Sequence, residues 1–117
     1  SQYKYPHARE RYAEIAAFCG FGGKTVDESY ANLYQKVGEL KAAIEIYPCI
    51  QEYGIEEKYF LDTLDAMTEA AWNDQCTGGN PVYPLMADIR ELYLCCYYGA
   101  AKYEAMKKPA AVPDQKK

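Results

Sequence analysis

The sequence predicts an all-α fold: a compact bundle of about four main helices in one domain. Apolar residues recur at three- and four-residue steps in four segments, and no run alternates with the two-residue period of a strand. The chain has 117 residues, enough for one domain with its own core. We expect the helical domain to span residues 1–106 and a flexible tail rich in Lys, Pro and Ala to follow over residues 107–117.

The first helix is expected to run from Pro6 to about Phe18. Proline suits the first position of a helix because the N–H that it lacks has no partner there. Gly20, Gly22 and Gly23 follow and are expected to end the helix.

The second helix has the clearest pattern. Thr25 and Glu28 predict a capping box, in which each side chain accepts a hydrogen bond from a first-turn amide. Gly38 lowers helix stability by ~1 kcal/mol relative to alanine, so we expect a close helix crossing there. A coiled-coil partner is less favoured, because Pro48 ends the pattern after about three heptads. The apolar stripe, expected to pack against neighbouring helices, consists of Val26, Tyr30, Leu33, Val37, Leu40 and Ile44.

Two further helices follow the link over residues 47–54. The third is expected to begin near Glu56, where acidic residues favour the positive end of the helix dipole. The fourth is expected to begin at Pro84 and to end or kink at Gly99. The stripe predicted to be buried on the third helix contains Phe60, Leu64, Met67 and Ala71, and that on the fourth contains Leu85, Ile89, Leu92 and Cys96.

Composition excludes several classes of function. The net charge of -4 argues against a nucleic-acid-binding surface. No apolar run approaches the ~18 residues that a membrane span needs, and no signal peptide is recognisable. The 5 cysteines form an odd set without CxxC pairs, which favours free thiols in a reducing compartment and therefore a cytoplasmic location. Cys95 and Cys96 are expected to be small buried residues rather than a vicinal disulfide.

The segment Asn73–Pro81, which reads NDQCTGGNP and is followed by Tyr83-Pro84-Leu85, is the most unusual part of the chain. Gly78 and Gly79 allow positive φ angles and close backbone approach. Pro84 suits the first position of the next helix. Physical reasoning favours a compact interhelical turn with a buried cysteine, and the alternative is a functional loop.

No complete active site can be assembled from the residue pattern. His7 is the single histidine, and the cysteines are too scattered for a metal site of three or four ligands. Cys76 has no identifiable base that would activate it as a nucleophile. The segment Gly20–Thr25 lacks the spacing of a phosphate-binding loop and follows a helix rather than a strand.

Two motifs nevertheless resemble those of a known family. The segment Pro6–Ala16, which reads PHARERYAEIA, resembles a sequence in bifunctional aldehyde–alcohol dehydrogenases. The loop DQCTGGNP at residues 74–81, the YPL at 83–85 and the YYG at 97–99 resemble their final segment in the same order. The core of that loop also occurs in single-function iron-dependent alcohol dehydrogenases. The similarity covers about Ser1 to Gly99.

The resemblance implies that the chain is the C-terminal helical part of the alcohol dehydrogenase half, inactive alone. In such proteins, NAD and iron serve the reduction of acetaldehyde to ethanol, and a second half makes the acetaldehyde from an acyl-CoA. The cofactor-binding domain and iron ligands would lie upstream, so no catalytic or metal-binding residue is expected here. The partners would be upstream domains of the same chain and, since the family forms filaments, further copies; no nucleic acid or membrane is expected. Lining of the substrate and cofactor pocket is assigned to Cys76, Thr77, Gly78 and Gly79.

One departure from the family pattern concerns Val82, because relatives commonly have arginine after the Asn-Pro step. Any contact that this arginine makes in relatives is therefore not expected here. The alternative to the enzyme-fragment interpretation is an independent helical protein-interaction module without enzymatic activity. Its support is the set of amphipathic stripes and the acidic surface.

Overall fold

The structure is a computed structural model that describes residues 5–107, and within that range every regular element is helical. The predicted all-α class is therefore confirmed. The predicted tail lies outside the described residues, apart from Lys107. The elements are α1 (Pro6–Phe18), α2 (Val26–Ala43), α3 (Ile50–Tyr53), α4 (Glu57–Asn73), the short 3₁₀ turn η2 (Thr77–Gly79), α5 (Met86–Tyr98) and α6 (Ala100–Lys107). Across this range no helix combines the length and apolar character that a membrane crossing requires.

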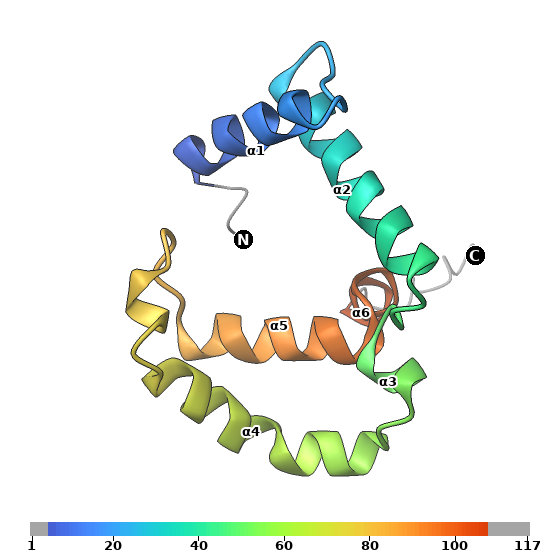
Figure 1. Ribbon diagram of the computed structural model, residues 1–117. Helices are drawn as coiled ribbons and strands as arrows, with labels where there is room; N and C mark the ends of the chain where they lie inside the picture. The colour runs from blue at the N-terminus through green and yellow to red at the C-terminus, as the bar shows by residue number, and fades with distance from the viewer. Residues whose placement is uncertain (1–4, 108–117) are drawn as a thin grey trace, which may run out of the picture.

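The helices follow an open arc (Figure 1). α1 and α2 pack against each other at one end, α4 and α5 at the other, and α3 and α6 pack against α5. The radius of gyration is 17.7 Å, whereas a compact domain of this length is expected near ~13 Å. The arrangement is thus more open than the compact bundle predicted from the sequence, because these helices pack mainly in neighbouring pairs rather than around one centre.

The core lies between α4 and α5. Phe60 and Leu64 of α4 are 3% and 0% exposed, and Tyr97 of α5 is 1% exposed. The Phe60 and Tyr97 rings are stacked, with centroids 4.2 Å apart. The Tyr97 hydroxyl donates a hydrogen bond of 2.8 Å to the Ile55 carbonyl, so the buried ring also keeps a partner for its polar end. This confirms the predicted position of Phe60 and Leu64 in the core.

The predicted buried stripe of α5 was largely wrong. Of its residues, Ile89 is buried, whereas Leu92 is half exposed and Cys96 exposed. The face that packs on α4 and α6 instead carries Leu94 and the two tyrosines Tyr97 and Tyr98. Aromatic rings bury more area than leucine or cysteine, and the two tyrosine hydroxyls find acceptors at the Ile55 carbonyl and the Glu57 carboxylate, so this face takes precedence.

The first half of α2 is largely as predicted, although Val26, the first residue of the predicted stripe, is 38% exposed. The Thr25 hydroxyl accepts a hydrogen bond from the Glu28 amide, and the Glu28 carboxylate accepts one from the Lys24 amide rather than from Thr25. The Tyr30 ring, which is half-buried, contacts the edge of the Tyr12 ring of α1 at 5.7 Å between centroids. α1 therefore covers the beginning of α2.

The second half of α2 differs from the prediction. Val37, Leu40 and Ile44 are 50%, 60% and 58% exposed. No close helix crossing occurs at Gly38 within the described residues, since a Cβ there would have no neighbour within 4 Å. The reason is the length of α1, which spans 13 residues against 18 in α2 and leaves the end of α2 uncovered.

Two short helices were not predicted. α3 lies in the segment assigned to a link; it follows the buried Cys49 and ends at Gly54, whose φ is 105°. α6 begins directly after Gly99, which turns the chain with a φ of 83°. Tyr103 of α6 then packs on the core, where its ring lies parallel to that of Tyr98. The predicted end at Gly99 is confirmed, but the chain continues as a helix.

The same C-terminal motif ends α1 and α2 with different residues. Gly20 and Glu45 each adopt a positive φ, 83° and 59°. In α1 the amides of Gly20 and Phe21 bond back to the carbonyls of Ala17 and Ala16. In α2 the amides of Glu45 and Ile46 donate to the carbonyls of Ala42 and Lys41 in the same pattern. This is the Schellman arrangement, in which glycine is the preferred residue.

We predict opposite effects of substitution at these two positions. Glu45→Gly should stabilise the chain by up to about 1 kcal/mol, because it removes the left-handed penalty of a side chain. Gly20→Ala should destabilise it by about 1 kcal/mol, and by backbone strain alone, since the added Cβ meets nothing within 4 Å. Urea unfolding followed by far-UV circular dichroism measures both. Shifts in the same direction for the two variants would contradict this account.

We also predict a loss of stability at alkaline pH. The Glu57 carboxylate, which accepts a 2.5 Å hydrogen bond from Tyr98, raises the pKa of Tyr98 to about 12, and burial raises the pKa of Tyr97 and of Tyr103. The folded chain therefore holds these protons to higher pH than the unfolded chain, whose tyrosines titrate near ~10. Stability should be fully present below about pH 10 and fall as pH rises toward about 12.

The free energy of unfolding, measured between pH 8 and pH 12, tests this prediction. Tyr98→Phe should make the decline shallower, whereas Tyr59→Phe, an exposed ring on α4, should leave its slope unchanged. An equal slope in the wild-type chain and Tyr98→Phe would show that this hydroxyl is not responsible.

Candidate functional site

The connection between α4 and α5 is held to the end of α4 by side chains of its own. The Asp74 carboxylate accepts a 2.7 Å hydrogen bond from the Cys76 amide, an Asx turn that reverses the chain after Asn73. The Thr77 hydroxyl donates a 2.5 Å hydrogen bond to the Ala71 carbonyl in the last turn of α4. These two contacts fix where Cys76 and Thr77 lie.

The rest of the connection leads into α5. The η2 turn closes through the hydrogen bond from the Asn80 amide to the Thr77 carbonyl. α5 begins at Met86, with Leu85 as its cap and the Asp88 carboxylate accepting from the Leu85 amide at 2.9 Å. Pro84 was predicted to occupy the first helical position. Pro84 instead lies two residues before Met86, because Asp88 caps the helix later than expected. The Pro84 side chain is buried.

A hollow of about 480 Å³ lies between the connection, the end of α4 and the start of α5. Three of the four predicted site residues, Cys76, Thr77 and Gly79, line it, and Gly78 does not. The expected burial of Cys76 was wrong: its side chain is exposed, because the Asx turn places it at the surface rather than under α5. The remaining lining residues, which the sequence interpretation had assigned to turns or helix packing, are Ala71, Asn80, Pro81, Pro84, Ile89 and Leu92.

The two glycines of the loop have no role inside the described chain. Neither has a positive φ, contrary to the conformation that the sequence allows, because the 3₁₀ turn uses ordinary right-handed angles. A Cβ at Gly78 or Gly79 would have no neighbour within 4 Å. Contacts within the described chain therefore do not require glycine at residue 79. The Gly79 backbone lines the hollow without a side chain.

The other candidate sites have ordinary structural explanations. Lys24 and Thr25, which end the glycine-rich segment, form the cap of α2 described above. His7 is exposed and packs edge-on against Tyr5 with ring centroids 5.5 Å apart. Within residues 5–107 there is no group of three or more His, Cys, Asp or Glu that could hold a metal ion. The residues described here do not fit an iron site.

The five cysteines are free in the structure, and the burial of Cys95 and Cys96 differs from the prediction. Cys49 is buried, Cys95 is half-buried and Cys96 is exposed. Burial raises the pKa of the Cys95 thiol, which makes it a poor nucleophile at neutral pH. Cys96 lies on the face of α5 that does not pack on α4, which is why it is not buried.

Comparison with known proteins identifies the source of these motifs. Residues 1–97 match the model described as "Fe-containing alcohol dehydrogenase family, C-terminal". The chain belongs to this family. The match covers both motifs of the sequence analysis except for the last two residues of the YYG signal. It confirms the resemblance inferred from PHARERYAEIA and DQCTGGNP.

Individual relatives are much longer than this chain. An aldehyde-alcohol dehydrogenase of Clostridium acetobutylicum is 44% identical over 96 residues, which are 82% of this chain and 11% of the relative. A bifunctional aldehyde-alcohol dehydrogenase, AdhE, of Escherichia coli K12 is 41% identical over 116 residues, 95% of this chain and 13% of the relative. An NADPH-dependent butanol dehydrogenase of Clostridium saccharobutylicum is 37% identical over 90 residues, 77% of this chain and 23% of the relative.

We predict that the Thr77 hydroxyl stabilises the connection. Thr77→Val should lower the free energy of unfolding by about 1 kcal/mol, because the Ala71 carbonyl loses its hydrogen-bond donor. Thr77→Ser, which keeps the donor, should lose less than half of that. Thr63→Val on α4 is the control, since the Thr63 hydroxyl bonds only within its own helix. Equal losses for Thr77→Val and Thr77→Ser in urea unfolding would contradict the assigned role.

Proposed function

We propose that this chain is the C-terminal helical part of an NAD- and iron-dependent alcohol dehydrogenase that reduces acetaldehyde to ethanol within a bifunctional aldehyde–alcohol dehydrogenase. The family match and the names of the most similar relatives support the enzyme class. The parent protein would be a cytoplasmic homo-oligomer. The chain would be inactive alone, with NAD and iron bound by upstream residues.

In this proposal the loop at residues 74–81 forms one wall of the active-site cleft. The observation that carries it is the hollow beside Cys76, Thr77 and Gly79. The Thr77 hydroxyl ties the loop to α4, and the Asp74 carboxylate holds the turn before it. Gly79 leaves open space that no part of the described chain uses. A backbone that is fixed and unobstructed is suited to close approach by a ligand.

The residues of this wall would shape the pocket rather than transfer protons. The lining contains no Asp, Glu, His, Lys or Arg side chain, so it lacks the usual general acids and bases. The Thr77 hydroxyl already donates to Ala71 and would act by holding the loop in place. Cys76 would contribute a small, exposed thiol to the surface of the pocket.

The test compares the two glycines of the loop in the full-length parent protein. Gly79→Val should lower kcat/KM for NADH-dependent reduction of acetaldehyde by at least about tenfold, because the new side chain enters the hollow. Gly78→Val is the matched control, since Gly78 lies one residue away, outside the lining, and also has no neighbour within 4 Å of an added Cβ. Equal activity of the two variants, with circular dichroism spectra like that of the wild type, would overturn the proposed wall.

A further inference from the structure

Two helices that border the inside of the arc each keep an apolar stripe uncovered. The α2 stripe consists of Val37, Leu40 and Ile44, all at least half exposed. The α5 stripe consists of Leu85, Leu92 and Cys96, of which Leu85 is 62% and Leu92 is 49% exposed. Both stripes recur at the spacing of an amphipathic helix, which normally packs such a face against another element.

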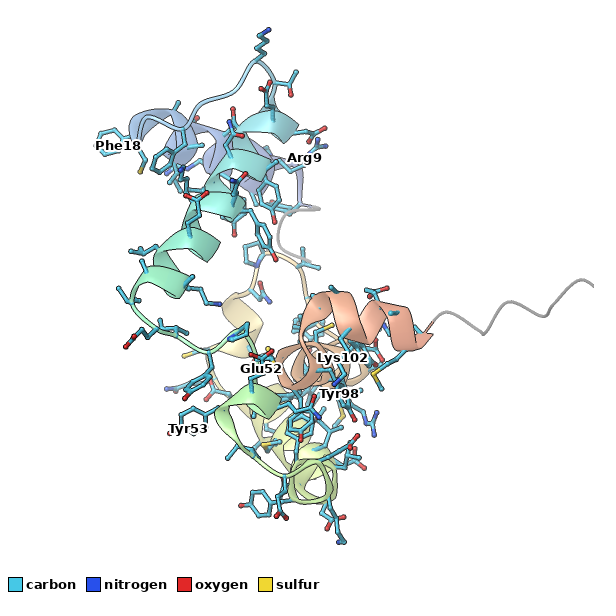
Figure 2. All side chains as sticks on the ribbon, turned by 90° about the vertical axis from the view of Figure 1, so that its right-hand side faces the viewer. Arg9, Phe18, Glu52, Tyr53, Tyr98 and Lys102 are labelled. Atoms are coloured by element: carbon cyan, nitrogen blue, oxygen red, sulfur yellow. The ribbon has the colours of Figure 1, made fainter. Side chains whose placement is uncertain are left out.

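A second hollow lies between the end of α2 and the α5 stripe, which it reaches at Cys96. It has a volume of about 550 Å³ and is lined by residues of the link that follows α2, among them Ile46 and Tyr47, together with Tyr53 of α3 and Cys96 of α5. Figure 2 shows Tyr53 projecting away from the core, in contrast to Tyr98, which lies among the side chains of α5 and α6. Exposed apolar side chains therefore occur on the second half of α2, on the link at Ile46 and Tyr47, and on α3 at Tyr53.

We propose that a helical segment of the parent polypeptide that precedes residue 1 packs between α2 and α5 and covers both stripes. This inference rests on the proposed function in one respect, namely that the chain is the end of a longer dehydrogenase. The matched family model is described as C-terminal, and the chain corresponds to only 11% and 13% of two relatives. Most of the parent would thus lie upstream and be available to cover these faces.

The position of α1 favours a covering segment from the same polypeptide. In Figure 1 the first turn of α1 and the connection between α4 and α5 both lie on the left, at the open side of the arc. The first turn of α1 is therefore on the side where the arc is open. A helix with apolar residues on two faces matches both walls, since ridges of side chains at three- and four-residue spacing pack into grooves of the same spacing.

The test uses hydrogen–deuterium exchange in the full-length parent protein. Leu40→Asp should speed exchange of the amides at residues 33–47 by at least about tenfold, because a charge would replace a leucine in a packed contact. Ala42→Asp is the matched control. It introduces the same charge on the same helix, but on the opposite face at an exposed residue, and should change exchange by less than about twofold. If Leu40→Asp prevents expression of the parent, Leu40→Ser with Ala42→Ser makes the same comparison.

Equal exchange in the Leu40 and Ala42 variants would overturn the inference. A 117-residue chain that sediments as a dimer, with residues 33–47 protected as strongly as in the parent, would also overturn it and assign the face to a second copy. The result is separable from the proposed function. A parent that reduces acetaldehyde normally while leaving residues 33–47 unprotected contradicts only the packing, whereas a protected but inactive parent contradicts only the function.

Discussion

The stack of Phe60 on Tyr97 joins α4 to α5 and determines the geometry of everything between them. Leu64 lies beside it with no exposed surface, and the Tyr97 hydroxyl ties the same ring to the Ile55 carbonyl before α4. With the two helices held in this way, the twelve-residue connection over 74–85 has fixed ends. The Asx turn at Asp74 and the Thr77 hydrogen bond then need to define only a short stretch of backbone. A loop anchored on a rigid pair of helices can keep a binding surface in place without a metal or a disulfide of its own.

In the part of the chain that the structure describes, α1 and α2 do not pack on the α4–α5 pair. α1 and α2 form a separate hairpin at the other end of the arc, and the second half of α2 lacks a neighbour among the described helices. An apolar stripe with half its surface exposed is unfavourable for an isolated domain. The same stripe is expected in a C-terminal piece whose upstream neighbour covers it. The open shape and the family match therefore support one picture, in which part of the core of the complete protein is contributed by residues outside this chain.

The sequence predicted where the helices begin and end better than which of their apolar side chains are buried. The bounds of α1, the cap of α2 at Thr25 and the buried residues Phe60 and Leu64 followed from local rules of propensity, capping and periodicity. The exposure of Leu40 and Leu92 could not follow from those rules, because periodicity shows that a helix has an apolar face but not which element covers it. Which face of α5 is buried depended on tertiary contacts of Tyr97 and Tyr98. Their hydroxyls donate to the Ile55 carbonyl before α4 and to the Glu57 carboxylate of α4. For the site, three of the four residues that the resemblance assigned to a pocket line the hollow, and their role toward a substrate or cofactor stays a prediction. The volume of the hollow and the open space at Gly79 required coordinates.

The most direct measurement of the central claim is a structure of the full-length parent protein with NAD bound. The account predicts that the backbone at Cys76, Thr77 and Gly79 lies against the bound cofactor or the substrate cavity beside it, on the loop geometry described here. It also predicts an upstream helix in contact with Leu40 on one side and Leu92 on the other. A parent structure in which this loop faces solvent, away from the cofactor and any substrate cavity, would contradict the claim that this chain supplies one wall of the active site.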